Sequence, residues 1–473
     1  MVEEQHAESM NPVTGSLKFY FSSLYNTLAA LVFFLVVAHY QAPTFVGRVA
    51  VIQLLQVLSG QTLMFLPPAI YAREISATLA RGGDDRALAG SVLGSVLAVS
   101  PALLLLLFFP RYMWLSIPFL ILNVYLGALQ SVASARGRFT QSAVTLIISS
   151  SARWFASAVP AYFGSITLLI LVWTLGAAAS VVYLHLSVGG VRPTFNWGIV
   201  WPMFLEGLPL YVSGILSFVS SQGDRVLTAL LLGGRGLGVY QLSALMAGAP
   251  MVLAGVFTSV LLPSASYYRE RGERVEKMCA LTLRFSLFVF GVASTLSVFV
   301  GVSVMHVFFP AYSEGVAAFK ILVLSTLVGA SYTNLYSFFV VKRVGLRPLI
   351  YISAATAALI TLSSYVLIPR VGVTGAAVSQ ALVQGVSAVV FTVWATRVGV
   401  LNIGVREASL IVLYTVVPAA VYVQPLLFPL SLLPLLRFSV VMNGGEFNAV
   451  KGFIPARLSF VGRLIGRIVG GLV

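Results

Sequence analysis

Arg153 stands out because it lies inside a long apolar stretch, directly after the polar run that begins at Ser149. An ionised side chain at the depth of a bilayer costs at least about 2.5 kcal/mol, so it should face a watery cavity or a partner. The serines before it would keep that face of a helix polar. Arg153 is therefore a candidate to contact an anionic substrate or to gate a cavity, and the alternative is a structural ion pair.

Asp224 and Arg225 are two adjacent charged residues within another apolar run, which extends from about 203 to 232. Neighbours on a helix point about 100° apart, so the two side chains do not face each other and each needs a partner on another helix. Two interpretations stay open. The pair has a functional role, or the unusual length of the run places it as an anchor at the outer interface.

Uncharged polar side chains also occur inside apolar runs. A set of this kind can line a sugar-binding cavity, where hydroxyl groups need hydrogen-bond partners, although each member alone is also typical of an interhelical hydrogen bond. The candidates are Tyr25, Asn26, Gln53, Gln56, Tyr240, Gln241 and Asn334.

These residues must be positioned by membrane helices, because 59% of the chain is hydrophobic and only 9% is charged. A span needs about 20 apolar residues, and runs of that size recur from end to end. We predict an all-α polytopic membrane protein with about fourteen transmembrane helices. The expected spans lie near 17–39, 49–71, 87–109, 112–134, 140–163, 165–187, 203–232, 237–262, 282–304, 317–341, 349–368, 373–396, 408–424 and 425–441.

The basic residues indicate the orientation of these spans. If the N-terminus is cytoplasmic, most of the 29 lysines and arginines fall in cytoplasmic loops, as the positive-inside rule requires. The net charge of +15 then reflects contact with anionic membrane lipids and does not imply nucleic acid. We expect a monomer in the plasma membrane with both termini cytoplasmic; residues 455–473 form an amphipathic helix on the inner leaflet or a frayed basic tail.

An internal repeat divides the chain. Leu66–Glu74 and Leu262–Glu270 are nearly the same sequence, and each comes where the second apolar run of a half ends. Parallel duplication is a common way to build transporters. We predict a six-helix domain over 1–200, a second over 201–400, and two more spans with a basic tail over 401–473.

Several function classes find no support in the sequence. No GxxxxGK[ST] motif occurs, and the glycines from Gly233 to Gly238 read as a turn between spans. The single cysteine, Cys279, and four scattered histidines predict neither a disulfide nor a metal site, and we expect no cofactor. A membrane glycosyltransferase would need a long acidic outer loop, whereas the acidic pair Asp84-Asp85 falls in a short inner loop, so we predict no enzyme.

Glycine and proline patterns in the second half carry a family resemblance. The chain resembles the polysaccharide-flippase branch of the multidrug/oligosaccharidyl-lipid/polysaccharide exporter superfamily. The stretches that carry the resemblance are Asp224 to Leu227, Leu232 to Gly234, Gly238 to Ala244, Leu262-Pro263, Phe309 to Tyr312 and Ile368 to Ala377.

The resemblance implies two pseudo-symmetric six-helix lobes in a V around a central cavity, plus two extra C-terminal helices, working by alternating access. It also implies a substrate, an isoprenoid-pyrophosphate-linked oligosaccharide that moves from the cytoplasmic to the outer leaflet, with cavity arginines meeting the pyrophosphate. Arg153 and Arg225, one from each predicted six-helix domain, fit that role.

A cation-coupled multidrug or small-molecule antiporter on the same fold is the alternative. It would couple to a proton or sodium ion, with Asp224 as the coupling residue. Drug exporters of the superfamily commonly carry an acidic residue in the first span, and between Leu17 and Tyr40 this chain has none. A purely structural scaffold is a weaker third interpretation, because buried charges in duplicated lobes indicate movement.

Overall fold

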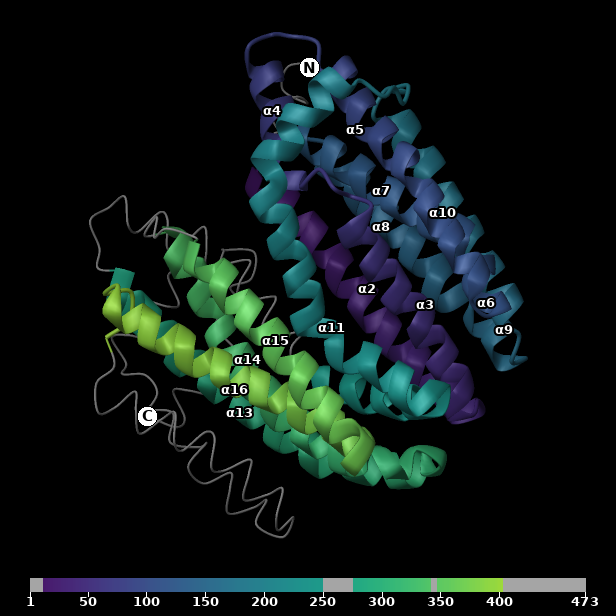
Figure 1. Ribbon diagram of the computed structural model, residues 1–473, viewed down its shortest axis with the longest axis vertical. Helices are drawn as coiled ribbons and strands as arrows, with labels where there is room; N and C mark the ends of the chain where they lie inside the picture. The colour runs from purple at the N-terminus through teal and green to yellow at the C-terminus, as the bar shows by residue number, and fades with distance from the viewer. Residues whose placement is uncertain (1–11, 250–274, 342–346, 403–473) are drawn as a thin grey trace. The chain divides into compact units, whose positions relative to one another are not determined.

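A computed structural model describes residues 12–249, 275–341 and 347–402, and all of its regular structure in these ranges is helical (Figure 1). The predicted all-α membrane fold is confirmed. The chain forms two compact units, Met1–Leu242 and Ser243–Val473. The predicted boundaries at 200 and 400 remain a prediction, but Arg153 and Arg225 both lie in the first unit.

Unit 1 contains short helices as well as long ones. Its elements are α2 (Pro12–Tyr40), α3 (Pro43–Thr62), α4 (Pro68–Ala80), α5 (Arg86–Val99), the 3-10 helix η1 (Ser100–Phe108), α6 (Arg111–Leu115), α7 (Ile117–Ala135), α8 (Phe139–Ser150), the π-helix η2 (Ser151–Ala156), α9 (Ala158–Tyr162), α10 (Ile166–Ser187) and most of α11 (Trp197–Gly248). Unit 2 contains α13 (Val275–Phe308), η3 (Pro310–Gly315), α14 (Val316–Val341), α15 (Arg347–Val371) and α16 (Val373–Arg397).

Ten candidate membrane spans lie within the described ranges. Most of them agree with the expected positions; α10 and α16 begin and end within a residue or so of the predicted ends. The predicted span 140–163 is present as α8, η2 and α9 in succession and not as one α-helix. The expected spans at 408–424 and 425–441 lie outside the described residues, so the count of fourteen stays a prediction.

The predicted end of the second span was wrong. The sequence predicted a span to residue 71, but α3 ends at Thr62 and a new helix, α4, begins at Pro68. The cause is the Pro67-Pro68 pair: proline lacks the amide proton that a helix interior needs, but its fixed φ suits the first helical position. The second copy of this motif, Leu262–Glu270, lies outside the described residues.

The helix α11 changes direction at Gly233, whose backbone has φ of 70° and ψ of −169°. This positive φ favours glycine. Beyond the kink, the chain packs backbone against backbone on the start of α3. A Cβ built on Gly238 would lie 1.8 Å from the carbonyl oxygen of Pro43, and one on Gly47 would lie 1.8 Å from that of Gly234. The glycines that the sequence assigned to a turn therefore also permit a close helix crossing.

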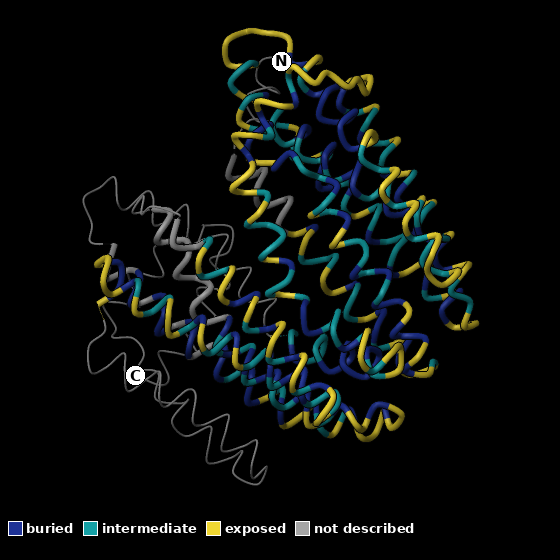
Figure 2. The backbone as a smooth tube through the Cα atoms, in the orientation of Figure 1, coloured by how far each residue is buried: buried dark blue, intermediate teal, exposed yellow. Residues whose placement is uncertain are grey.

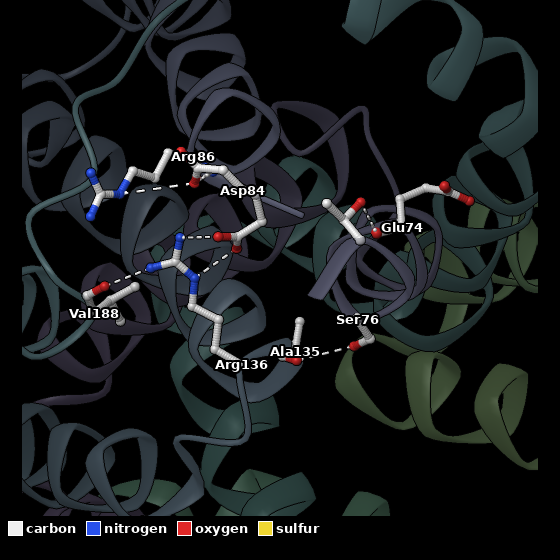
Figure 3. Close-up of polar contacts among 9 residues, drawn as sticks. Glu74, Ser76, Asp84, Arg86, Ala135, Arg136 and Val188 are labelled. Atoms are coloured by element: carbon white, nitrogen blue, oxygen red, sulfur yellow. Dashed lines mark hydrogen bonds and ion pairs between the residues drawn. The ribbon is translucent and has the colours of Figure 1, made fainter. Parts of the chain in front are cut away.

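Three helix ends meet at one end of unit 1 (Figure 3). Arg136, just after α7, donates from Nε and Nη2 to the two carboxylate oxygens of Asp85, at 2.7 and 2.8 Å, and from Nη1 to the carbonyl oxygen of Val188 at 2.6 Å. Asp85 precedes α5 and Val188 follows α10. All three positions fall in predicted inner loops, and their meeting supports the predicted up-and-down order of the spans.

Predicted outer loops meet in the same way. Gln41, after α2, donates a hydrogen bond of 2.9 Å to the carbonyl oxygen of Tyr162, at the end of α9. The rings of Tyr40 and Tyr162 also contact each other, with centroids 5.2 Å apart. Buried apolar residues from α4, α5, α7, α10 and the start of α11 form one hydrophobic cluster of the unit, and the buried stretches are dark blue in Figure 2.

Large apolar side chains are also exposed along the spans. Phe108 is 87% exposed, and Leu104, Leu105 and Leu107 on the same element are also exposed. A soluble protein rarely presents a contiguous apolar surface of this kind, whereas hydrocarbon solvates it well. Together with the candidate spans, this surface identifies a multi-pass membrane protein.

Candidate functional site

Arg153 lies on η2, the six-residue π-helical segment that interrupts the fifth predicted span. π-helical turns are rare and occur often at functional sites. The segment follows α8 without a break, because Ser151 keeps helical backbone angles. The wider turn places Arg153 against α7 and α10, while its neighbours Ser150 and Ser151 contact α2.

Three aromatic rings surround the Arg153 guanidinium. Its Cζ lies 4.4 Å from the ring centroid of Trp154, 4.7 Å from that of Trp173 and 5.6 Å from that of Phe119. All three rings are almost completely buried. Each cation–π contact contributes from about 0.5 kcal/mol to about 2 kcal/mol when desolvated, so the rings offset part of the cost of burying the charge. We call Arg153 and these rings the arginine cage.

No carboxylate neutralises the arginine cage within the described part of the chain, since no ion pair involves Arg153. Its buried Nε also has no hydrogen-bond partner there. The backbone is held instead: the carbonyl oxygen of Arg153 accepts a hydrogen bond of 2.7 Å from Nε1 of Trp173 and another from the Ser157 hydroxyl. The structural ion pair considered from the sequence is therefore absent among the described residues.

The structure brings Tyr25 and Asn26 to the same element. The Tyr25 and Ser151 hydroxyls are 2.7 Å apart, and Oδ1 of Asn26 accepts hydrogen bonds of 2.8 Å from both Ser150 Oγ and Trp154 Nε1. These contacts attach α2 to η2 and fix the Trp154 ring, which in turn lies over Arg153. Tyr25 and Asn26 thus position the arginine cage.

A second polar cluster forms around Asp224, which is 3% exposed. Its carboxylate accepts hydrogen bonds from the Tyr240 hydroxyl and, at 2.8 Å, from the backbone amide of Arg225. Because Asp224 and Tyr240 lie on opposite sides of the Gly233 kink, their bond joins the two arms of α11. The guanidinium of Arg225 instead donates to Oε1 of Gln222 at 3.0 Å, as expected for neighbours that point apart.

The remaining predicted residues contact different helices. Gln241 Nε2 lies 3.4 Å from Gln53 Oε1, which extends the second cluster to α3. Gln56 Nε2 donates to Asn123 Oδ1 on α7 at 2.8 Å, so Gln53 and Gln56 do not share a partner. The side chain of Asn334, on α14, lies outside the described side chains. A sugar-binding role for these residues stays a prediction.

Sequence reasoning missed the aromatic residues of the arginine cage. Trp154 is adjacent to Arg153, but Phe119 and Trp173 are distant in the sequence and have no spacing that marks them. Asn123 was missed for the same reason. A search for tryptophans buried in neighbouring spans would have found Trp173, because an indole N–H in hydrocarbon needs an acceptor such as the Arg153 carbonyl oxygen.

The chain also resembles known families and structures. Residues 87–316 match a family model described as polysaccharide biosynthesis protein. The fold superposes on the lipid II flippase MurJ in an inward closed conformation with a TM-score of 0.62, at 13% identity over 89% of this chain and 96% of that chain. The predicted resemblance is therefore confirmed at the level of the fold, and the family match covers about half of the chain.

Two further structures share this exporter fold. One is an inward-facing multidrug resistance MATE family transporter of the MOP superfamily, with a TM-score of 0.57 at 12% identity over 84% of this chain and 98% of that chain. The other is a mutant of the Vibrio cholerae MATE transporter VcmN, with a TM-score of 0.53 at 14% identity over 82% and 98%. No curated protein matches the chain in a sequence comparison.

Proposed function

We propose that this protein is a flippase that carries an isoprenoid-pyrophosphate-linked oligosaccharide from the cytoplasmic to the outer leaflet by alternating access. The observation that carries the proposal is the arginine cage: a fixed cation at membrane depth with no carboxylate partner in the described residues. A cation held in this way lacks an anion, and a pyrophosphate supplies one. The polysaccharide biosynthesis match and the MurJ fold support the same substrate class.

An oligosaccharide linked to a membrane lipid needs a protein to cross the bilayer at a useful rate. Each unpaired sugar hydroxyl costs several kcal/mol in hydrocarbon, so an oligosaccharide head does not cross a bilayer unaided. An anionic head that moves outward gains about 2.3 kcal/mol per charge for each 100 mV of inside-negative potential. The protein therefore needs only to supply a polar path and a site for the anion, and no catalytic step.

Cells that lack the protein test the proposal. Lipid extracts should contain an accumulated polyprenyl carrier loaded with sugar, accessible from the cytoplasmic side only. Expression of the unaltered protein should clear it, and expression of Arg153→Met at the same level should not. A carrier pool that stays unchanged when the protein is removed would contradict the proposal.

The cation-coupled antiporter remains the second candidate because Asp224 is a buried carboxylate beside a tyrosine hydroxyl. Its MATE neighbours are named as multidrug resistance transporters. On this alternative, drug resistance should depend on Asp224 and not on Arg153, which distinguishes the two candidates in one set of variants.

A further inference from the structure

An aromatic groove lies on unit 1, apart from both polar clusters. It has a volume of about 400 Å³ and is lined mainly by aromatic rings, with Phe65 and Thr62 on the α3–α4 side and the first turns of α11 opposite. Trp197 and Trp201 are 54% and 42% exposed, and their rings stack with centroids 5.1 Å apart. Tyr211 closes the groove by donating a 3.0 Å hydrogen bond to the carbonyl oxygen of Thr62.

Most of the lining residues belong to candidate membrane spans, which are Pro43–Thr62, Arg86–Phe108 and Trp197–Gly248; Phe65 and Phe195 lie just outside them. Trp197 and Trp201 lie in the first turns of the third of these spans, the position at which aromatic side chains of membrane proteins meet the lipid headgroups. An open groove lined by apolar rings accommodates one flexible apolar chain well. The occupant that the bilayer offers is an acyl chain.

The segment before α11 adds a cation beside the groove. Arg192 is exposed and makes no hydrogen bond or ion pair with the described residues. Phe195, three residues later, lines the groove. An extended chain advances about 3.5 Å per residue, so the two positions are about 10 Å apart along the backbone. That separation suits a lipid whose phosphate lies at Arg192 while its chain enters the groove.

Close packing on α5 fixes this segment. The amide of Thr194 donates to the carbonyl oxygen of Gly90 at 2.9 Å, and a Cβ built on Gly94 would lie 2.2 Å from the carbonyl oxygen of Thr194. The glycines of α5 thus let the backbone lie flat on the helix. Arg192 and Phe195 are held by a rigid support instead of a free loop.

From this arrangement we propose that the aromatic groove binds one anionic phospholipid, with its phosphate at Arg192 and an acyl chain along Trp197 and Trp201. The lipid is a bound partner and not the transported cargo. The preference for an anionic headgroup comes from Arg192, and the length of chain held comes from the rings. A lone arginine near an anionic headgroup supports a preference of about fivefold over a zwitterionic lipid.

Tryptophan fluorescence in nanodiscs tests the proposal, because bromine on an acyl chain quenches an indole that it touches. Two samples contain the same mixture of phosphatidylcholine and phosphatidylglycerol; in one only the phosphatidylglycerol is brominated, and in the other an equal amount of phosphatidylcholine is. We expect the brominated phosphatidylglycerol to quench about two- to fivefold more strongly. The excess should disappear in Arg192→Gln and persist in Arg138→Gln, a matched change at another exposed arginine.

A Trp201→Leu variant locates the signal, since it should lose most of the excess while keeping the groove apolar. Equal quenching by the two lipids in the unaltered protein would show an ordinary interfacial aromatic belt and overturn the proposal. An excess that survives in Arg192→Gln would overturn it as well. Neither result depends on what the protein transports.

Discussion

At the scale of single residues, the charge of Arg153 carries two separate costs: the loss of water around the guanidinium and the absence of a counter-ion. The aromatic rings stabilise the Arg153 guanidinium, but the charge still lacks an anion in the described structure. A charge surrounded by apolar rings and without an ion-pair partner is seldom optimal for stability, since an apolar residue of similar size is often neutral or better. Its presence is more readily explained by binding than by folding.

Replacing Arg153 with methionine should therefore separate stability from transport. We expect Arg153→Met to melt at or above the temperature of the unaltered protein, because it fills the cage without a charge, while transport falls at least about tenfold. Arg153→Lys keeps a cation and should retain part of the transport. Melting temperature in detergent and lipid-carrier accumulation in cells measure the two effects; a lower melting temperature with normal transport would assign Arg153 a structural role.

Asp224 allows a second residue-scale prediction. Asparagine keeps one acceptor oxygen for the Arg225 amide, and its NH2 group can donate to the Tyr240 hydroxyl oxygen in place of accepting from it. Asp224→Asn should therefore fold and should leave flipping largely intact. Asp224→Ala leaves both donors unsatisfied and should cost about 1–3 kcal/mol of stability. Thermal unfolding and transport of the two variants provide the measurement. If Asp224→Asn abolishes transport while remaining folded, the cation-coupled alternative gains the support.

The sequence predicted the unusual residues but not their partners. Arg153 and Asp224 were identifiable because charge is rare and costly at membrane depth. The cage rings were not, because Trp173 and Phe119 reach Arg153 only through the packing of α10 and α7. For Tyr25 and Asn26 the sequence predicted polarity within a span, whereas their attachment to η2 depends on tertiary structure.

At the scale of elements, glycine decides how closely helices approach. Gly47 and Gly60 lie on the same helix, α3, but in different surroundings. A Cβ on Gly47 would lie 1.8 Å from the Gly234 carbonyl oxygen, whereas one on Gly60 would meet nothing within 4 Å. The two positions form a matched pair for testing the crossing of α3 and α11.

We expect Gly47→Ala to destabilise the protein by about 1–3 kcal/mol through overpacking. Gly60→Ala should be neutral or stabilising by up to about 1 kcal/mol, because alanine has the higher helix propensity. Thermal unfolding of the two variants in the same detergent checks the difference. Equal melting temperatures would mean that the backbones of α3 and α11 are not in contact.

Element boundaries show where sequence reasoning reaches its limit. Hydropathy located the spans, yet it could not distinguish one continuous helix from α8, η2 and α9 in series, because all three are similarly apolar. The proline pair at 67 and 68 was interpreted as the end of a span although proline equally well begins a helix. Both differences concern backbone geometry, about which the hydropathy of a segment gives almost no information.

At the scale of the whole molecule, the predicted orientation requires that alternate loops of unit 1 lie at opposite ends of its helices. The contacts among Asp85, Arg136 and Val188 gather one set of loops at one end, and Gln41 with Tyr162 gathers the other set at the opposite end. Which end faces the cytoplasm rests on the distribution of basic residues.

Accessibility of introduced cysteines tests that orientation. In a Cys279→Ser background, Arg81→Cys should react with a membrane-impermeant maleimide only after the cells are opened, and Phe163→Cys should react in intact cells. Both positions are exposed, so reactivity reports location and not burial. The reverse pattern of reactivity would show that the predicted orientation in the membrane is wrong, and the proposed direction of transport would be wrong with it.

The most direct test of the account is a flipping measurement with purified protein in liposomes that contain a fluorescent isoprenoid-pyrophosphate-linked oligosaccharide. A membrane-impermeant reductant bleaches label in the outer leaflet of the liposome, so flipping appears as loss of the protected fraction. The account predicts nearly complete bleaching with the unaltered protein and with Arg138→Gln, and a protected half with Arg153→Met. The account would be contradicted if half of the fluorescence stayed protected from the reductant with the unaltered protein, or if bleaching were complete with Arg153→Met.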